Sequence, residues 1–154
     1  MGKISITKEF SWDMAHMLSD HRGLCSNLHG HTYRMQVQIS RKNEGLLEDT
    51  LHSDGMVMDF SDLKAIVQRK IIEPLDHAFM FWCDTNDSVE RQIAELLRSS
   101  GKKVATVKYR PTAEEMAASF FDDLTQELVD SDIVVDKIKI WETTTSFAEV
   151  IREV

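Results

Sequence analysis

Two segments near the start of the chain alternate polar and apolar residues with the period of a half-buried strand. The first strand is expected over about residues 4–16 and the second over about 31–41, joined by a loop that carries Cys25. One face of the first run holds Phe10, Trp12, Met14 and His16, and one face of the second holds Tyr33, Met35, Val37 and Ile39. These two faces predict a shared core.

The middle of the chain follows the helical period instead. A short strand at 55–59 is expected to lead into a helix from about Phe60 to Glu73, which Pro74 ends. The charged stretch 84–103 is also compatible with a helix and has the character of an accessory insertion. The apolar side of this second helix is expected to be Val89, Ile93, Leu96 and Leu97.

A third helix is expected to begin at Thr112, because Thr112 and Glu115 have the spacing of a capping box. Its apolar face holds Ala117, Phe120, Phe121, Leu124 and Leu128. Two strands follow, at about 133–142 and 147–151, and the first is expected to place Val134, Ile138, Ile140 and Glu142 on one face. This order predicts an α+β fold, with an antiparallel four-stranded sheet and two main helices on one face.

Composition limits the organisation and the partners of the chain. With 154 residues, 42% of them hydrophobic, we expect one domain over 1–154 that includes the insertion at about 84–103. A net charge of −8 without a basic stripe argues against nucleic-acid binding. The absence of a long apolar run, of a signal-peptide pattern and of a disulfide framework predicts a cytoplasmic protein that does not bind membranes, with Cys83 as a free thiol.

Residues that bind metals gather at the ends of the first two strands. His29 and His31 are two positions apart and share one strand face, and a neighbouring strand can bring His16 to the same pocket. Gly30 between them is expected to leave open space on the other side. Three neutral imidazoles favour Zn²⁺ and leave one coordination position open for water or substrate.

Cys25, four residues before His29, admits two interpretations. As a fourth ligand it would close a structural Cys-His₃ site, whereas as a thiol standing off the metal it would be catalytic. The spacing alone does not decide between them. His21 and His52 lie in polar, loop-like surroundings, where solvated histidine is the default.

Two further groups of titratable residues are candidates for chemistry. Asp76 and His77 lie between a predicted helix end and a very apolar segment, where they are either a proton-transfer pair or a capping pair. Glu142 ends an apolar strand face, where it either lies in water or accepts hydrogen bonds from a ligand with a guanidine-like edge.

Six short motifs occur in order across nearly the whole chain. They are Phe10-x₅-His16, Cys25-x₃-His29-Gly30-His31, Met58-Asp59-Phe60, Leu75-Asp76-His77, Pro111-Thr112-Ala113-Glu114 and Trp141-Glu142-Thr143. Each is weak alone, but the ordered set resembles the 6-pyruvoyl tetrahydropterin synthase and 6-carboxytetrahydropterin synthase family. The three-residue gap before His29 is similar to that of the bacterial 6-carboxytetrahydropterin synthases of the queuosine pathway.

The resemblance implies a tunnelling fold, with trimers that close into a barrel, stack into hexamers and hold active sites between subunits. It implies conversion of 7,8-dihydroneopterin triphosphate to 6-carboxy-5,6,7,8-tetrahydropterin, with release of acetaldehyde and triphosphate. The implied roles are zinc ligands for His16, His29 and His31, a base for Cys25, a proton relay from an adjoining subunit for Asp76 and His77, and a pterin anchor for Glu142.

The chain departs from the family pattern at two places. Residues 78–82 are Ala-Phe-Met-Phe-Trp where the family usually has a nearby Leu-Asn, and the stretch 84–103 is longer than in compact members. These departures keep open a 6-pyruvoyl tetrahydropterin synthase, another pterin side-chain lyase, or a non-catalytic pterin- or zinc-binding member of the fold. The presence of Cys25, Asp76, His77 and Glu142 together favours an enzyme.

Overall fold

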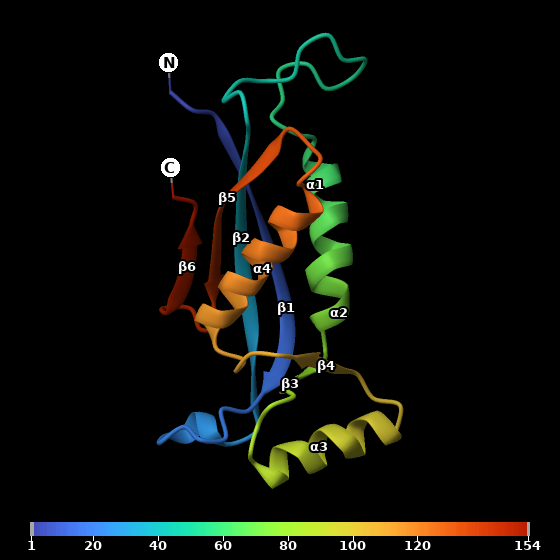
Figure 1. Cartoon of the computed structure of the whole chain (residues 1–154), viewed down its shortest axis with the longest axis vertical. Helices are drawn as coiled ribbons and strands as arrows, with labels where there is room; N and C mark the ends of the chain where they lie inside the picture. Colours follow the sequence, from blue (N-terminus) through green and yellow to red (C-terminus); the bar gives the residue numbers. More distant parts are fainter. Residues whose placement is uncertain (1, 154) are drawn as a thin grey trace.

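A long antiparallel pair of strands forms the centre of the molecule. The computed structural model describes residues 2–153 (Figure 1). Strand β1, Ser5–His16, pairs with β2, His29–Arg41, along its whole length, so that His16 lies opposite His29. The predicted faces are confirmed, because alternate residues of both strands are buried. The second strand begins two residues earlier than expected.

The sheet has six strands rather than four. Strand β5, Ile133–Trp141, pairs antiparallel with β2, and β6, Phe147–Ile151, pairs with β5. On the other side, β3, Phe79–Trp82, lies parallel to β1, and β4, Val104–Val107, lies parallel to β3. The order is β4-β3-β1-β2-β5-β6, so the predicted α+β class is confirmed and the predicted four-stranded antiparallel sheet is wrong.

Burial on both faces explains why the sequence pattern missed β3. Met80 belongs to the main core, whereas its neighbours Phe79 and Phe81 belong to a second, smaller core on the opposite face. A strand that is buried on both faces has no polar alternation to reveal it. Strand β4 is only four residues long, which gives alternation little room to appear.

The first main helix is interrupted by a short π-helical turn. Helix α1, Phe60–Val67, continues through a π-helical turn at Gln68–Ile72 into α2, Glu73–Leu75. Pro74 therefore lies one residue before the end of this continuous helix at Leu75, so the expected end at Glu73 is two residues early. The strand expected at 55–59 is wrong: these residues form turns, and Asp59 caps α1 by accepting the Ser61 N–H at 2.7 Å.

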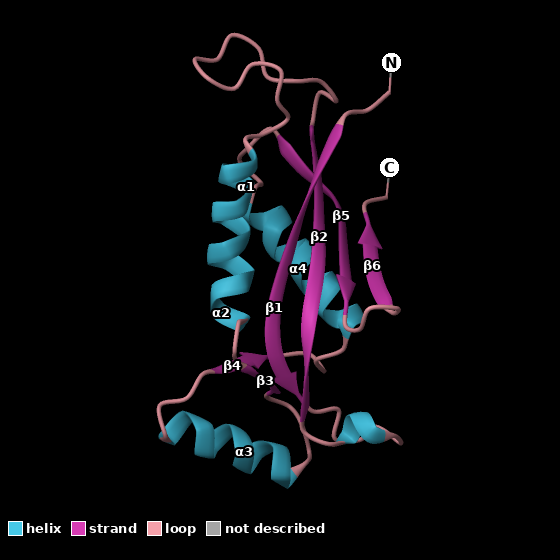
Figure 2. Cartoon of the chain, turned by 180° about the vertical axis from the view of Figure 1, so that it is seen from behind, coloured by secondary structure: helices cyan, strands magenta, loops and turns pink. Residues whose placement is uncertain are grey.

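The second main helix follows its predicted cap. Helix α4, Ala113–Glu127, begins after Thr112, whose hydroxyl accepts the Glu115 N–H at 3.2 Å. Helices α1, α2 and α4 cover one face of the sheet, as predicted, and the sheet's other face is seen unobstructed from behind (Figure 2). No helix among residues 2–153 is long and apolar enough to cross a membrane.

Helix α3, Ser88–Ser99, lies at the end of the sheet beneath β3 and β4 (Figure 1). It packs into the second core, which comprises Met17, Phe79, Phe81 and Ala94 with partly buried neighbours that include Ile93 and Leu97. The predicted apolar side is wrong at Val89 and Leu96, which are 55% and 66% exposed. Glu90 and Ala94 are buried instead, because the helix turns a different stripe toward β3.

A bulge changes which residues of β5 face the core. The pairing of β5 with β2 shifts register between Gln38 and Ile39, so that Asp136 is an extra residue on β5. Val135 is therefore buried, whereas Val134 is only half-buried. The expected alignment of Val134 with Ile138 and Ile140 is wrong for this reason.

Candidate metal centre and active site

The three histidines predicted to bind a metal lie together where β1 ends and β2 begins. His16 lies opposite His29 in the pairing, and His31 follows two residues later on the same face of β2. The centroid of the His16 ring lies 4.6 Å from that of His29 and 5.2 Å from that of His31. One nitrogen from each ring lies within 4.8 Å of the others. The strand pattern therefore correctly brought these side chains together.

Backbone carbonyl groups fix the orientation of two of these rings. His16 Nδ1 lies 2.8 Å from the Pro111 carbonyl oxygen, and His29 Nδ1 lies 2.7 Å from that of Asn27. A carbonyl oxygen only accepts hydrogen bonds, so both Nδ1 atoms carry the proton and both Nε2 atoms present a lone pair. Such carbonyl partners are the usual outer support of metal-binding histidines.

The inward-facing nitrogens have the spacing of metal ligands. The Nε2 atoms of His16 and His29 are 3.0 Å apart, close to the roughly 3.3 Å expected between two nitrogens on a tetrahedral zinc ion. Two lone pairs at that distance repel each other unless a cation lies between them. His31 Nε2 is buried and, among residues 2–153, has no hydrogen-bond partner. These donors fit a metal ion.

Glu142 lies beside the cluster at the end of β5. Its Oε1 atom is 3.5 Å from His16 Nε2 and 3.6 Å from His31 Nε2, and 27% of its side chain is exposed. The structure therefore places Glu142 neither in open solvent nor in the core but at the edge of the histidine cluster. From there its carboxylate can contact a ligand that approaches the histidines.

Burial keeps the histidines in the form that binds metals. The pKa of His16 is lowered from 6.5 to about 4, mainly by burial and also by the neighbouring His29 and His31, although the hydrogen bond to the Pro111 carbonyl opposes this shift. Burial also lowers the pKa of His31, against the opposing effect of the Glu142 carboxylate. Both imidazoles are consequently neutral at pH 7, as metal ligation requires.

Cys25 lies in the loop between β1 and β2, within the short 3₁₀ turn Leu24–Ser26, and is half-buried. Among the described residues, the cluster of mutually close ligand atoms contains the three histidines and not Cys25. Burial raises the pKa of Tyr33, and the negative charges of Glu142 and Cys25 raise it further. The Cys25 carbonyl accepts the Leu18 N–H at 2.9 Å, which holds Cys25 close to the end of β1 at His16. Cys25 thus lies near the histidine pocket without being one of the clustered ligands.

Asp76 and His77 form a hydrogen-bonded pair just after α2. Asp76 Oδ1 lies 2.9 Å from His77 Nδ1 and accepts the Asp13 N–H at 3.1 Å, while the His77 N–H donates to the Asp13 carbonyl at 2.7 Å. Burial alone would raise the pKa of Asp76, but the Asp13 N–H, His77 and Lys103 together lower it. His77 has a φ of +62°, a strained backbone conformation for a residue with a side chain.

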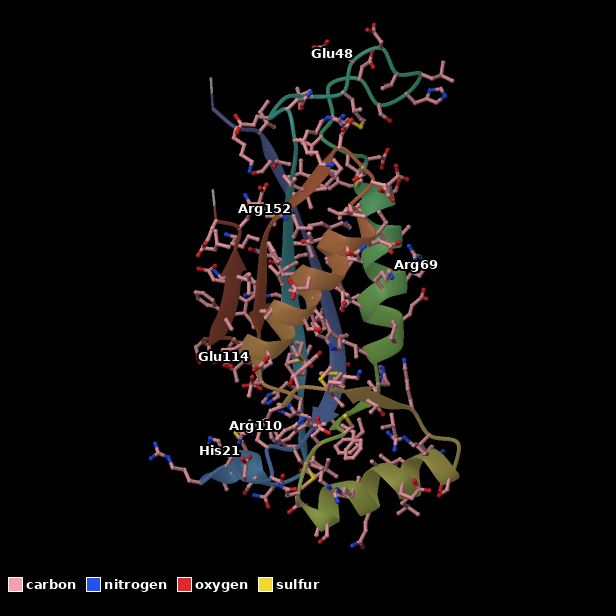
Figure 3. All side chains as sticks on the ribbon, in the orientation of Figure 1. His21, Glu48, Arg69, Arg110, Glu114 and Arg152 are labelled. Carbon is pink, nitrogen blue, oxygen red and sulfur yellow. The ribbon has the colours of Figure 1, made fainter. Side chains whose placement is uncertain are left out.

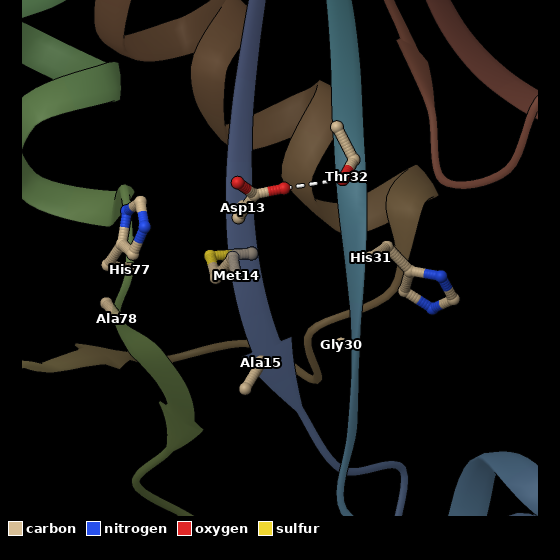
Figure 4. Close-up of a pocket in the computed structure, with 8 residues that line it drawn as sticks. All are labelled: Asp13, Met14, Ala15, Gly30, His31, Thr32, His77 and Ala78. Carbon is tan, nitrogen blue, oxygen red and sulfur yellow. Dashed lines mark hydrogen bonds between the residues drawn. The ribbon is translucent and has the colours of Figure 1, made fainter.

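The predicted site residues fall into two groups within one chain. A shallow pocket of about 400 Å³ is lined by Asp13, Met14, Ala15, Gly30, His31, Thr32, His77 and Ala78. In Figure 4, His77 lies beside β1, whereas the His31 side chain projects away from it on the far side of β2. One chain therefore does not bring Asp76 and His77 to the histidine cluster.

Two details of this region differ from expectation. Gly30 lines this pocket, as its predicted open side requires, but a Cβ atom on Gly30 would lie 3.0 Å from the Met14 carbonyl oxygen, a close approach of β1 that was not expected. The contacts of Asp13 were not predicted from the sequence. Its backbone N–H donates to Asp76 and its carbonyl accepts the His77 N–H. Its side chain accepts a hydrogen bond from the Thr32 hydroxyl (Figure 4). An aspartate on the polar face of a strand carries no signal of such a role.

The two loop histidines, His21 and His52, are both at the surface. His21 is exposed, and its Nδ1 accepts the Gly23 N–H at 2.8 Å, which closes a local turn. His52 is also exposed. The prediction that both are solvated is confirmed.

Comparison with known proteins shows a consistent relationship along the chain. A 6-carboxy-5,6,7,8-tetrahydropterin synthase of Haemophilus influenzae is 47% identical over 144 residues, which cover 94% of this chain and 96% of the relative. A protein of the same name from Aquifex aeolicus is 35% identical, covering 81% and 74%.

Solved structures share the fold. An uncharacterized protein of Wolinella succinogenes aligns over 97% of this chain and 98% of its own, with a TM-score of 0.79 and 22% identity. The 6-pyruvoyl tetrahydropterin synthase of Plasmodium falciparum aligns over 98% of both chains, with a TM-score of 0.68 and 21% identity. The sequence model of 6-pyruvoyl tetrahydropterin synthase matches residues 5–153, and the chain therefore belongs to this family of enzymes.

Proposed function

We propose that this protein is a zinc-dependent 6-carboxy-5,6,7,8-tetrahydropterin synthase. Its substrate is 7,8-dihydroneopterin triphosphate, and it releases acetaldehyde and triphosphate in a reaction that supplies precursors of queuosine and other 7-deazapurines. The proposal is supported by the 47% identity to the Haemophilus influenzae protein of that name, which spans nearly both chains. It takes the whole of residues 1–154 as one cytoplasmic domain, although Met1 and Val154 lie outside the described residues.

The convergence of three imidazole nitrogens, one from each histidine, is the single observation that carries this proposal. His16 and His29 are oriented by carbonyl groups, and His31 Nε2 is buried without a hydrogen-bond partner among residues 2–153. Three imidazoles favour zinc and leave a position open for substrate. When bound, zinc acts as a Lewis acid that makes the hydroxyl groups and neighbouring protons of the substrate side chain more acidic.

The surrounding residues of the same chain have distinct roles in the proposal. Cys25 is a catalytic base because it lies near the pocket without joining the ligand cluster, and it removes a proton from the substrate side chain. Glu142, at the edge of the cluster, accepts hydrogen bonds from the amino group and ring N–H of the pterin. This contact orients the side chain of the substrate toward the histidines.

Asp76 and His77 act in the site of a neighbouring copy. They lie across β1 and β2 from the His31 side chain, and His77 is 75% exposed. Their hydrogen bond, with the pKa of Asp76 lowered, suits transfer of a proton through His77. We therefore propose that the enzyme is a homo-oligomer, a trimer or hexamer, in which each site is completed by two chains.

Substitution of Cys25 tests this assignment. We expect Cys25→Ala to keep about one zinc ion per chain, because the ligands are the three histidines, while turnover falls by about 10²–10⁴-fold, the usual contribution of general-base catalysis. Metal analysis and steady-state kinetics measure the two effects, with Cys83→Ala as the matched control because Cys83 is an exposed free thiol. Loss of zinc from Cys25→Ala would instead mean a closed Cys-His₃ structural site.

A further inference from the structure

The 84–103 segment lies against the loop that carries Cys25. This loop, residues 17–28, and α3 occupy the same end of the molecule in both views (Figures 1 and 2). Met17, the residue after His16, packs into the second core with Phe79, Phe81 and Ala94. The segment therefore supports the start of the loop directly beside a residue of the histidine cluster.

Glu90 of α3 is almost completely buried at this contact. It is 1% exposed, and its Oε2 atom accepts hydrogen bonds from Ser19 Oγ at 3.0 Å and Thr85 Oγ1 at 2.8 Å. Its Oε1 atom is buried and has no hydrogen-bond partner among residues 2–153. Burying a carboxyl group with one oxygen unpaired lowers stability, so helix stability alone does not account for its placement.

The start of α3 shows that Glu90 is diverted from its usual local contact. Asp87 caps the helix by accepting the Glu90 N–H at 2.7 Å. In a capping box the carboxyl group at the position of Glu90 would accept the N–H of the capping residue in return. Here the Asp87 N–H donates to Thr85 Oγ1 at 3.2 Å, which leaves Glu90 free to reach Ser19.

Ser19 connects this buried group to the segment around Cys25. The residue before it, Leu18, donates its N–H to the Cys25 carbonyl at 2.9 Å, which closes the loop on itself. The next residue, Asp20, makes a second contact, because its carboxylate lies 2.5 Å from the Arg110 guanidinium. Figure 3 labels Arg110, close to His21 of the same loop. Residues 20–24 are exposed, so these two contacts hold the loop from its first residues.

We propose that Glu90 is a positioning residue, which through its hydrogen bond to Ser19 fixes the loop that presents Cys25 to the histidine pocket. This role rests on the proposed function of Cys25 as the base. In this role the 84–103 segment does more than cover the end of the sheet, because α3 also holds the loop that carries Cys25 in place. The Thr85 hydroxyl, on the other side of the same carboxyl group, holds Glu90 within its own segment.

Two substitutions that each remove one hydroxyl donor to Glu90 separate positioning from a purely structural role. Ser19→Ala cuts the link to the loop, and Ser19 is only partly buried, so the fold should tolerate it. Thr85→Val, the comparison variant, cuts the link within the α3 segment and also removes the acceptor of the Asp87 N–H, so its direct effects fall at the start of α3. We expect amide hydrogen exchange of residues 18–25 to rise about tenfold in Ser19→Ala and less than twofold in Thr85→Val, because a hydrogen bond to a carboxyl group restrains local opening.

Kinetics provide the second measurement. We expect kcat of Ser19→Ala to fall roughly tenfold with KM within twofold, because small displacements of a catalytic group reduce turnover more than binding. Zinc content should be unchanged, and Ser19→Thr, which keeps the hydroxyl, should restore kcat. Equal effects of Ser19→Ala and Thr85→Val on loop exchange and kcat, or no effect of either, would overturn the positioning role.

The two proposals fail in different ways. Hydrogen exchange reports the link between Glu90 and the loop without any assumption about catalysis, so an unchanged loop in Ser19→Ala overturns the inference about Glu90. Full activity of Cys25→Ala overturns the role of Cys25 instead, and with it the catalytic consequence of the link.

Discussion

At the residue scale, the histidine cluster has the properties of a binding site rather than of a stabilising core. His16 is fully buried, its pKa is lowered to about 4, and its Nε2 atom faces the lone pair of another imidazole. The facing lone pairs reduce the stability of the metal-free protein, and the lowered pKa reduces it further below about pH 6.5. A bound cation reverses the balance, because it pairs with all three nitrogen atoms.

The lowered pKa of His16 predicts how the stability of the metal-free protein depends on pH. Between about pH 6.5 and pH 4 the unfolded chain binds a proton at His16 that the folded chain does not, so the free energy of unfolding should fall as the pH falls through this window. The contribution is on the order of 3 kcal/mol. Above pH 6.5 and below pH 4, His16 causes no further change in the free energy of unfolding.

Thermal unfolding of the metal-free protein across this pH range measures the effect. The His16→Gln variant should show a weaker dependence, whereas His52→Gln, which replaces an exposed loop histidine, should match the unmodified protein. A dependence that is identical in His16→Gln and the unmodified protein would show that other groups cause it.

At the element scale, some helices and strands could be predicted from the sequence and others could not. Strands β1 and β2 were predictable because one face is buried and the other is not, and this alternation also brought the three histidines together. The cap of α4 was predictable from Thr112 and Glu115, since capping is a local interaction. Strand β3 could not be predicted from alternation, because it is buried on both faces.

Gly30 provides a test of how closely β1 and β2 approach each other at the cluster. In Gly30→Ala the new methyl group would lie 3.0 Å from the Met14 carbonyl oxygen, which belongs to a paired strand and cannot move easily. Strand propensity alone favours alanine by roughly 0.5–1 kcal/mol, but overpacking costs about 1–3 kcal/mol. We therefore expect a net loss of stability and weaker metal binding.

Chemical denaturation and metal titration check this expectation. Gly45→Ala is the matched control, because its methyl group would meet only the Asn43 side chain, at an ordinary 3.5 Å. Unchanged stability and metal affinity in Gly30→Ala would mean that the two strands adjust without cost and that glycine is not required between the two histidines.

At the scale of the whole molecule, the two groups of site residues lie on different sides of the central strands. The residue pattern left Asp76 and His77 as either a proton-transfer pair or a capping pair. It gave no signal of their distance from the histidines, because the strand period fixes which face a side chain is on and not which residues it meets. Their separation in one chain, together with the exposure of His77, is the structural reason to expect a shared site between copies.

Mixing two inactive variants tests this arrangement. His29→Ala lacks a metal ligand and His77→Ala lacks the relay, so each homo-oligomer should have little activity. If each site takes Asp76 and His77 from a neighbour, hybrids reassembled from both variants should contain some intact sites and recover a measurable fraction of activity. No recovery in hybrids whose mixed composition is verified by native mass spectrometry would place all the catalytic residues within one chain.

The identity of the reaction products decides whether this protein is a 6-carboxy-5,6,7,8-tetrahydropterin synthase. The zinc-loaded protein is incubated with 7,8-dihydroneopterin triphosphate, and the products are identified by mass spectrometry, with His29→Ala and the metal-free protein as controls. We predict 6-carboxy-5,6,7,8-tetrahydropterin and acetaldehyde from the loaded protein and neither from the controls. Formation of a 6-pyruvoyl product, or of no product by protein shown to contain one zinc ion per chain, would contradict the proposed function.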